Sequence, residues 1–485
     1  MLDIGPSAAQ DGVLIGGEWR AGEAALPVED PSTGEIVGEI AAGGAADVDD
    51  AVAAARAALT GEWGALSAAE RGRVLSRIGL RVAECADELA RLEAIDVGKP
   101  LKQAKADALA LARYLEFYGG AADKLHGETI PYLDGYTVFT RREPHGVTGH
   151  ITPWNYPMQI IGRSVTAALA VGNAAVLKPA EEASLTALAF ARIANDCGLP
   201  KGALNVVAGD GETAGAALAA HPDVDHVSFT GSSAVGALIQ TAAAARAAPV
   251  TLELGGKSAQ LVFDDADLDA ALPFLVNAGV QNAGQTCSAA SRLLVQRGVY
   301  DALLERLARR YGALRVGPAL RDLEVGPLIS ARQQKIVQGY FDLAEARSGI
   351  AVAARGRIVD DAPGGGHYFA PALLTGVAPS HRLAQEEIFG PVQVVIPFDD
   401  EDEAVAIANG TAFGLVAAVW TRDGARQLRV AGRLKAGQVF VNNYGAGGGV
   451  ELPFGGVKRS GHGREKGFEA LYGFTALKTV AVLHG

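Results

Sequence analysis

Residues 146–178 read GVTGHITPWNYPMQIIGRSVTAALAVGNAAVLK, and this stretch decides the fold. Short apolar runs over residues 146–152 and 174–178 predict two strands, and residues 159–170 between them have the apolar spacing of a helix. A strand, a helix and a second strand in succession form the unit from which parallel sheets are built. The stretch therefore predicts an α/β protein.

The same alternation continues as far as residue 247. So regular a pattern favours a parallel, doubly wound sheet over a β-rich domain with a few added helices. The further strands are predicted at residues 203–207 and 226–229, and the further helices at residues 184–197, 212–220 and 233–247.

Helices precede this region, and a second α/β domain follows it. The turn ELGGK at residues 253–257 breaks the alternation and is a candidate domain hinge. Apolar periodicity predicts helices before the region at residues 45–59, 69–93 and 102–125. After the hinge it predicts helices at residues 266–282, 297–314, 330–344, 401–409 and 425–434, and strands at residues 292–296, 392–397, 415–420 and 438–442.

Two segments belong to neither domain pattern. Residues 129–142 and 474–483 alternate apolar and polar side chains and are predicted to be strands with no helical partner. Such strands expose their edges, and a partner subunit is one common way to cover them.

Composition and charge exclude several classes of protein. The 485 residues are too many for one core, so two or three domains are expected. The net charge of −12, with acids and bases interspersed, argues against a nucleic-acid surface. The N-terminus lacks the pattern of a secretory signal, and the longest uncharged stretch, residues 270–291, is too polar to cross a membrane. Three cysteines far apart in sequence cannot all pair, which favours a soluble protein of the reducing cytoplasm.

Cys287 is the candidate nucleophile. It ends a loop of small and polar residues, NAGQTCS at residues 282–288, which is typical of a segment that presents a reactive side chain. A cysteine–histidine hydrolase is a rival interpretation, but no histidine lies within fifty residues of Cys287 in the sequence.

Four more motifs carry candidate chemistry, and each also has a structural interpretation. In TPWNYP at residues 152–157, Asn155 is either an amide donor for an anion or a buried structural hydrogen-bonding group. Glu181 follows a predicted strand, where a carboxylate binds ribose hydroxyls, although surface acids are common. FTGSSAVG at residues 229–236 is either an anion site or a plain helix cap. Glu253 precedes two glycines and is either a general base or solvated.

Together these segments resemble the NAD(P)-dependent aldehyde dehydrogenase family over essentially the whole chain. The match opens at IGGEW, residues 15–19, and includes the motifs described above. It also includes KPAE at residues 178–181, GQTC at 284–287, EIFGP at 387–391, PFGG at 453–456 and SGHGRE at 460–465.

The resemblance implies a three-part architecture. Residues 1–128 and 143–254 would form a Rossmann-type dinucleotide-binding domain, and residues 255–445 an α/β catalytic domain. Residues 129–142 and 466–485 would form a small β oligomerisation segment, so the protein should be a homodimer or homotetramer.

The resemblance also implies the reaction. Cys287 would attack the aldehyde to give a thiohemiacetal whose oxyanion is held by the Asn155 amide and the Cys287 backbone N–H. Hydride transfer would leave a thioester, which water activated by Glu253 would hydrolyse. Lys178 and Glu465, the latter in a proton relay, complete the predicted catalytic set, and no metal ion is assigned.

The expected cofactor is NAD. Glu181 beside the ribose 2′-hydroxyl would repel the 2′-phosphate of NADP, although the neighbouring Lys178 softens this preference. Glu387 and Phe389 would contact the nicotinamide end, and Gly211 the phosphates. The full predicted cofactor set is Thr152, Pro153, Trp154, Lys178, Glu181, Gly211, Phe229, Gly231, Ser232, Leu254, Glu387 and Phe389.

The substrate is less well determined. Arg163 has the spacing at which relatives that act on semialdehydes carry an arginine for a distal carboxylate, and it either has that role or pairs with an acid of the protein. The second arginine of such relatives is replaced by Gln281. Tyr156 and Ser288 complete the predicted substrate set. The loop at residues 444–451 contains three consecutive glycines and ends in Glu451, which would instead favour a cationic substrate.

Two alternatives remain open within this resemblance. A CoA-acylating semialdehyde dehydrogenase would resolve the thioester with a thiol, but such relatives commonly lack the base that Glu253 provides. A structural protein that had kept only the fold would be recognised by loss of Cys287 or Glu253, and both are present.

Overall fold

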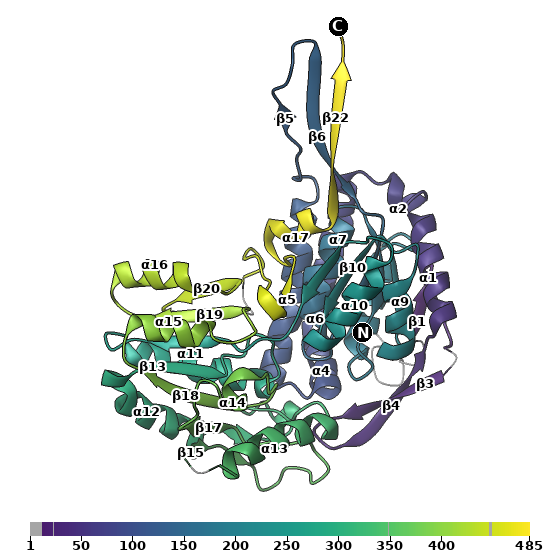
Figure 1. Ribbon diagram of the computed structural model, residues 1–485. Helices are drawn as coiled ribbons and strands as arrows, with labels where there is room; N and C mark the ends of the chain where they lie inside the picture. Colours follow the sequence, from purple (N-terminus) through teal and green to yellow (C-terminus); the bar gives the residue numbers. More distant parts are fainter. Residues whose placement is uncertain (1–11, 23, 348, 446–448) are drawn as a thin grey trace.

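The protein has two α/β domains and a projecting arm. The computed structural model describes residues 12–22, 24–347, 349–445 and 449–485. The two domains lie side by side, and a narrow three-stranded arm that carries the C-terminus extends away from the first (Figure 1). The N-terminal segment without the pattern of a secretory signal falls within residues 1–11, which lie outside the described residues.

The first domain contains the predicted doubly wound sheet. Its five central strands are parallel in the order β9-β8-β7-β10-β11, so the chain winds outward in both directions from β7, and the topological switch point lies between β7 and β10. Every residue of β7, β8 and β10 is buried, as expected for strands covered by helices on both faces. In sheet order the strands are β2 (Glu18–Arg20), β1 (Val13–Ile15), β9 (Leu204–Val207), β8 (Ala174–Lys178), β7 (Val147–Ile151), β10 (His226–Thr230), β11 (Val250–Glu253) and β21 (Gly461–His462).

Helices cover both faces of this sheet. The prediction of one helix over residues 69–93 is wrong, because the helix breaks at Cys85, whose φ of −94° and ψ of 9° end α3 and begin α4. The helices are α1 (Ala45–Ala58), α2 (Glu62–Ala65), α3 (Ala68–Glu84), α4 (Ala86–Val97), α5 (Leu101–Ala121), α6 (Pro157–Ile160), α7 (Thr166–Ala170), α8 (Leu185–Asp196), α9 (Ala216–Ala220) and α10 (Ser233–Ala244), with π-helical turns at Ile161–Val165 and Gly211–Gly215.

The second domain is built on a seven-stranded sheet, parallel except for its edge strand β15. In sheet order the strands are β15 (Ala351–Arg355), β17 (Ala372–Thr375), β18 (Val392–Phe398), β13 (Arg292–Gln296), β12 (Ala259–Val262), β19 (Val416–Trp420) and β20 (Gln438–Val441). The helices are α11 (Leu268–Val280), α12 (Tyr300–Gly312), α13 (Ala331–Glu345), α14 (Arg382–Gln385), α15 (Glu401–Asn409) and α16 (Gly424–Arg433), and β14 (Arg315–Val316) pairs with β16 (Arg357–Ile358).

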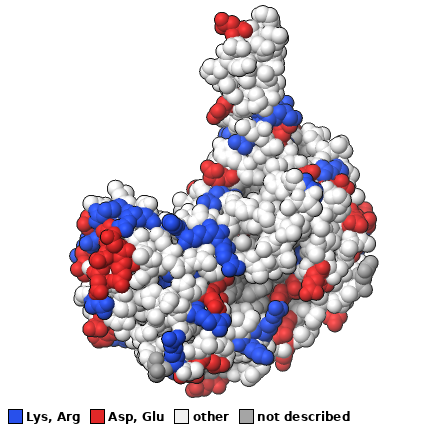
Figure 2. Space-filling model, viewed as in Figure 1, with Lys and Arg blue, Asp and Glu red and all other residues white. Residues whose placement is uncertain are grey.

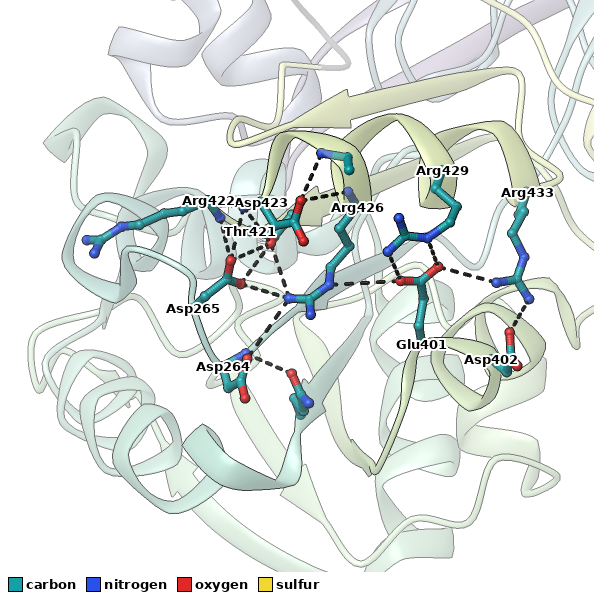
Figure 3. A network of polar contacts seen from close by, with 12 residues as sticks. Asp264, Asp265, Glu401, Asp402, Thr421, Arg422, Asp423, Arg426, Arg429 and Arg433 are labelled. Carbon is teal, nitrogen blue, oxygen red and sulfur yellow. Dashed lines mark hydrogen bonds and ion pairs between the residues drawn. The ribbon is translucent and has the colours of Figure 1, made fainter.

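Charged side chains fasten α16 to this domain. Arg429 makes two hydrogen bonds to Glu401, of 2.8 and 2.7 Å, and Arg426 donates to Asp265 over 3.1 Å (Figure 3). Asp423 caps the helix by accepting hydrogen bonds from two backbone N–H groups. Arg426 and Arg429 therefore help to hold α16 against the rest of the second domain.

The arm consists of β22 (Thr475–Leu483), β6 (Tyr136–Pro144) and β5 (Thr129–Ile130). The prediction of one continuous strand over residues 129–142 is wrong, because β5 and β6 form an antiparallel hairpin with a turn between them. Only part of the segment predicted for the arm, residues 466–485, extends away from the first domain. Its helix α17 (Gly467–Gly473) instead packs on the first domain through Ala470 and Leu471. A separate hairpin of β3 (Ala24–Asp30) and β4 (Glu35–Ala42) reaches the second domain through a hydrogen bond from Tyr368 to the Ser32 carbonyl.

The carboxyl ends of the strands of the first sheet and the amino ends of the strands of the second sheet both face the space between the domains. Glu253 is the last residue of β11, so the carboxyl ends of the first sheet point toward this space. In the second sheet, Cys287 precedes β13 and Glu387 precedes β18. The amino ends of these two strands therefore point toward the same space between the domains. Ligands of doubly wound sheets bind outside the carboxyl ends at the switch point. Among the described residues, no helix combines the length and apolar character that crossing a membrane requires.

Candidate active site

A cavity of about 360 Å³ lies between the domains and brings most of the predicted residues together. It contains Cys287, Asn155 and Glu253, which come from three different segments of the chain. The other predicted residues that line it are Pro153, Trp154, Tyr156, Arg163, Gly231, Ser232, Gln281, Ser288, Glu387 and Phe389. The structure does not place the remaining predicted residues in the cavity wall: Thr152, Lys178, Glu181, Gly211, Phe229, Leu254 and Glu465.

The loop before Cys287 has an unusual backbone. Asn282, Ala283 and Gly284 have φ values of 49°, 53° and 72°, and the first two are non-glycine residues in the strained left-handed region. A Cβ on Gly284 would lie 2.3 Å from the Gly390 carbonyl, so only glycine fits there. The Gln285 side chain holds the turn closed, because it donates to the Asn282 carbonyl over 3.1 Å and accepts the Ile329 N–H over 2.9 Å.

Asn155 is buried and connected to this loop in two ways. Its amide nitrogen donates to the Gln285 carbonyl over 2.9 Å, and its own carbonyl accepts from the Asn282 side chain over 3.0 Å. An amide nitrogen has two hydrogens, so one remains for a ligand in the cavity. Asn155 and the backbone N–H of Cys287 can thus form a pair of donors beside the sulfur.

Glu253 also lines the cavity and is 1 % exposed. Neither carboxyl oxygen has a hydrogen-bond partner within the described part of the chain. Burial, together with the nearby Glu465, raises its pKa well above 4.5, although Arg163 opposes the shift. A carboxyl group with unsatisfied oxygens next to a cavity is available to water or substrate.

Arg163 pairs with an acid of the protein. Its guanidinium forms a buried ion pair with Glu465, and it stacks over the Phe454 ring at 4.8 Å. Ser228 donates to the other oxygen of Glu465 over 3.3 Å. One guanidinium nitrogen of Arg163, Nη2, has no hydrogen-bond partner among the residues that the structure places.

The thiol of Cys287 is neutral in this environment. Burial raises its pKa to about 12, even though the positive charge of Arg163 lowers it. Glu387 and Glu253 add to the upward shift. A base is therefore needed to generate the thiolate at neutral pH.

The residues predicted for the cofactor surround the carboxyl ends of β7, β8 and β10. Lys178 and Glu181 form an ion pair of 2.9 Å just after β8, and Ser232 caps the twelve-residue helix α10. The hydroxyl of Thr230 is buried and lacks a partner among the described residues. A carboxylate for ribose, a helix N-terminus for phosphate and a buried hydroxyl without a partner fit an extended dinucleotide.

The residues predicted for the nicotinamide end of the cofactor include two from the second domain, Glu387 and Phe389. Glu387 accepts the Gly256 N–H over 2.9 Å, and burial raises its pKa to about 7. The rings of Trp154 and Phe389 meet edge to face with centres 5.2 Å apart. A flat aromatic ring and ribose hydroxyls could therefore bind between the domains, next to Cys287.

The predicted substrate residues Tyr156, Gln281 and Ser288 line the cavity with uncharged polar groups. Glu451 instead forms an ion pair of 2.6 Å with Arg113 on the surface. Of the glycine loop at residues 444–451, residues 446–448 lie outside the described residues.

Several lining residues were not predicted from the sequence. Phe454 lies in the motif PFGG, but no local signal showed that its ring would contact Arg163. Polar and apolar groups from Ile329 to Ile336 also line the cavity, at the start of α13. The start of that helix was detectable, since Ser330 is a typical N-cap.

Known proteins match this chain over nearly its full length. The model of the aldehyde dehydrogenase family matches residues 19–480. A hydroxyisobutyraldehyde dehydrogenase from Mycolicibacterium austroafricanum is 42% identical over 474 residues, which cover 97% of this chain and 93% of that protein.

Solved structures agree with this match. The fold is similar to that of a candidate aldehyde dehydrogenase from Burkholderia cenocepacia, with a TM-score of 0.97 and 65% identity over 98% of this chain and 100% of that one. It is also similar to betaine aldehyde dehydrogenase from Staphylococcus aureus in complex with NAD+, with a TM-score of 0.95 and 35% identity over 99% of this chain and 96% of that one. The chain therefore belongs to the aldehyde dehydrogenase family.

Proposed function

We propose that the protein oxidises an aldehyde to its carboxylic acid with NAD as the hydride acceptor, through a thioester on Cys287 that water hydrolyses. Aldehyde oxidation follows from the family, and the cavity shared by Cys287, Asn155 and Glu253 carries the rest of the proposal. A nucleophile, an oxyanion donor and a base for water are the three groups that this chemistry requires.

Each residue has a distinct role in the proposed reaction. The Cys287 sulfur bonds to the aldehyde carbon, and its proton leaves to Glu253 directly or through water. The amide of Asn155 and the backbone N–H of Cys287 stabilise the oxyanion. When bound, NAD supplies the acceptor for the hydride that leaves the same carbon. Glu253 next releases the thiol proton toward solvent, through the relay proposed for Glu465 and Lys178. It then takes a proton from water as that water attacks the thioester, which frees the carboxylic acid and the Cys287 thiol.

The choice of NAD over NADP rests on Glu181. In the proposed complex its carboxylate would face the ribose 2′-hydroxyl and repel a 2′-phosphate, and its 2.9 Å ion pair with Lys178 supports that orientation. The complex of the Staphylococcus aureus relative with NAD+ supports the same choice.

The substrate class depends on Arg163. A semialdehyde with a distal carboxylate is favoured by the unpartnered Nη2 of Arg163, which could bind one carboxylate oxygen. A small hydroxyaldehyde is the second candidate, because Glu465 already neutralises Arg163 and the rest of the wall includes Gln159, Gln281 and Ser288. The activity named for the Mycolicibacterium relative agrees with the second candidate.

The reaction is tested by following NADH formation with purified protein, NAD and a panel of aldehydes. We expect activity with at least one aldehyde and its loss in Cys287→Ala, with Cys197→Ala as the matched control because that thiol lies away from the cavity. A protein that makes no NADH with any aldehyde, or a Cys287→Ala variant with full activity, would refute the proposal. Activity that requires added CoA would instead identify an acylating enzyme.

The substrate class is tested with Arg163→Leu. If Arg163 binds a distal carboxylate, kcat/KM should fall about a hundredfold for carboxylated semialdehydes and much less for neutral aldehydes of equal length. Equal losses on both would exclude the carboxylate role and favour the hydroxyaldehyde. In that case Gln281→Leu should lower kcat/KM more for hydroxylated aldehydes than for plain aldehydes.

A further inference from the structure

The junction between α4 and α5 buries four ionisable side chains just outside the cavity wall. We define the α4–α5 junction as residues 93–107. Glu93 and Lys99 have exposed fractions of 0 %, Asp96 of 1 % and Asp107 of 3 %. None of these described side chains lines the cavity, and the proposed reaction uses none of them.

Lys99 is the central residue of this group. Its ammonium lies 2.5 Å from a Glu93 oxygen, forms a second ion pair with Asp107 and sits 3.9 Å from the centre of the Tyr156 ring. Burial alone would lower the pKa of Lys99, but the two carboxylates raise it, so the cation persists. Buried ion pairs add little net stability, so such a group is better explained by the geometry that it fixes.

The junction holds both ends of the loop that carries Asn155. On the C-terminal side of Asn155, Lys99 contacts Tyr156, and Asp107 accepts a hydrogen bond of 2.5 Å from the Gln159 side chain. On the N-terminal side of Asn155, Trp154 packs against a small apolar cluster of Val97, Ala183 and Ile329. The backbone of Asn155 thus lies between two fixed points.

The same junction holds the loop that carries Cys287. The Gln103 side-chain oxygen accepts the backbone N–H of Asn282 over 3.0 Å, and the Asn282 side chain donates to the Asn155 carbonyl over 3.0 Å. Lys102 also donates its backbone N–H to Asp322 of the second domain over 2.7 Å. One short segment therefore contacts the nucleophile loop, the oxyanion loop and the opposite domain.

We propose that the α4–α5 junction is a positioning element that sets the Asn155 amide against Cys287, with Lys99 and Asp107 fixing the oxyanion loop and Gln103 fixing the nucleophile loop. This role rests on the proposed function. None of these residues touches the reacting atoms, and each acts through Asn155 or Asn282. An oxyanion donor must lie close to its ideal position, since displacement by about 1 Å can cost about a hundredfold in rate.

The first test uses Gln103→Leu, which removes one acceptor from a partly exposed helix position and changes no charge. We measure the single-turnover rate of NADH formation with enzyme in excess over aldehyde. The rate should fall about tenfold, while the Kd for NAD, measured by fluorescence titration, and the rate of Cys287 alkylation by iodoacetamide stay within twofold. Gln103→Glu keeps an oxygen acceptor and should restore most of the rate.

A double-mutant cycle with Asn155→Ala tests whether the effect passes through that amide. In the Asn155→Ala background, Gln103→Leu should change the rate less than twofold, because the Asn155 amide is no longer there to be mispositioned. An equal tenfold loss in both backgrounds would show that Gln103 acts independently of Asn155 and would overturn the proposal.

The second test removes the buried charges together, with Lys99→Met combined with Asp107→Asn. The rate should again fall at least tenfold per folded molecule, with the Kd for NAD unchanged. Lys105→Met, on the exposed face of the same helix, is the matched control and should behave as wild type. If the double variant does not fold, the Gln103 series still decides the question.

Two further outcomes separate this inference from the function on which it rests. If wild type forms NADH and the Gln103 and Lys99 variants keep its single-turnover rate, the positioning role is refuted and the proposed function stands. If wild type forms no NADH with any aldehyde, the proposed function fails and this role fails with it.

Discussion

At the scale of single residues, burial raises the pKa values of both main reacting groups of the cavity. Burial raises the pKa of the Cys287 thiol to about 12 and that of the Glu253 carboxyl well above 4.5. A carboxyl with a raised pKa is a stronger base once it ionises, so the Glu253 carboxylate can accept the proton of the Cys287 thiol at low cost when a substrate arrives. The same shift makes Glu253 a suitable base for water in the second half of the reaction.

Replacing Glu253 should therefore block hydrolysis more than hydride transfer. In Glu253→Gln we expect deacylation to slow by about two to four orders of magnitude. The acyl-enzyme should then accumulate, and mass spectrometry of quenched protein should detect it on Cys287. Glu181→Gln, which makes the same chemical change away from the sulfur, should weaken NAD binding without trapping a thioester. Unchanged turnover without a trapped thioester would remove Glu253 from this role.

Wild-type deacylation should also depend on pH in a defined direction. Below the pKa of Glu253 the carboxyl is protonated and cannot accept a proton from water, so the rate should fall as pH falls. Because the pKa is raised, the midpoint should lie well above 4.5, and the dependence should vanish in Glu253→Gln. A pH-independent wild-type rate above pH 5 would contradict this assignment.

At the scale of elements, the sequence predicts what local periodicity determines. The largely buried strand β13 and the helix α15 fall at the predicted residues, because apolar spacing and caps are local signals. The break at Cys85 was missed, because apolar periodicity runs on through both α3 and α4. The hairpin of β3 and β4 was missed as well, because its loop is held by contacts to residues far away in the chain, such as that of Ser32 with Tyr368.

In the candidate site, too, the residues that lie in local motifs were predicted from the sequence, and the contacts between distant segments were not. Cys287, Asn155 and Glu253 lie in short motifs that the sequence displays, and the fold brings them to one cavity. The partner of Arg163 could not be predicted, because Glu465 comes from a segment distant in the sequence, which pairs with the first sheet through β21. The buried Lys99 was equally invisible, since a lysine after a helix is normally solvated and only tertiary packing buries it.

At the scale of the whole molecule, the arm is the feature that a single chain does not explain. Its three strands project from the first domain and present mostly uncharged surface (Figure 2). Leu477 and Leu483 of β22 are 56 % and 65 % exposed, and Ile130 and Tyr136 on the neighbouring strands are also exposed. Apolar side chains on a strand edge are typical of a surface that a second copy covers.

We therefore propose that the protein assembles through this arm, and we expect wild type to sediment as a dimer or tetramer. Leu477→Arg combined with Leu483→Arg should raise the dissociation constant at least a hundredfold, because two charges would be buried in an apolar contact. The thermal midpoint of the dissociated protomer should change little, since both side chains already face solvent there. Leu428→Arg, at an 80 % exposed position on α16, is the control and should leave the assembly intact. A monomeric wild type, or an arm variant that assembles as wild type does, would show that the arm has another purpose.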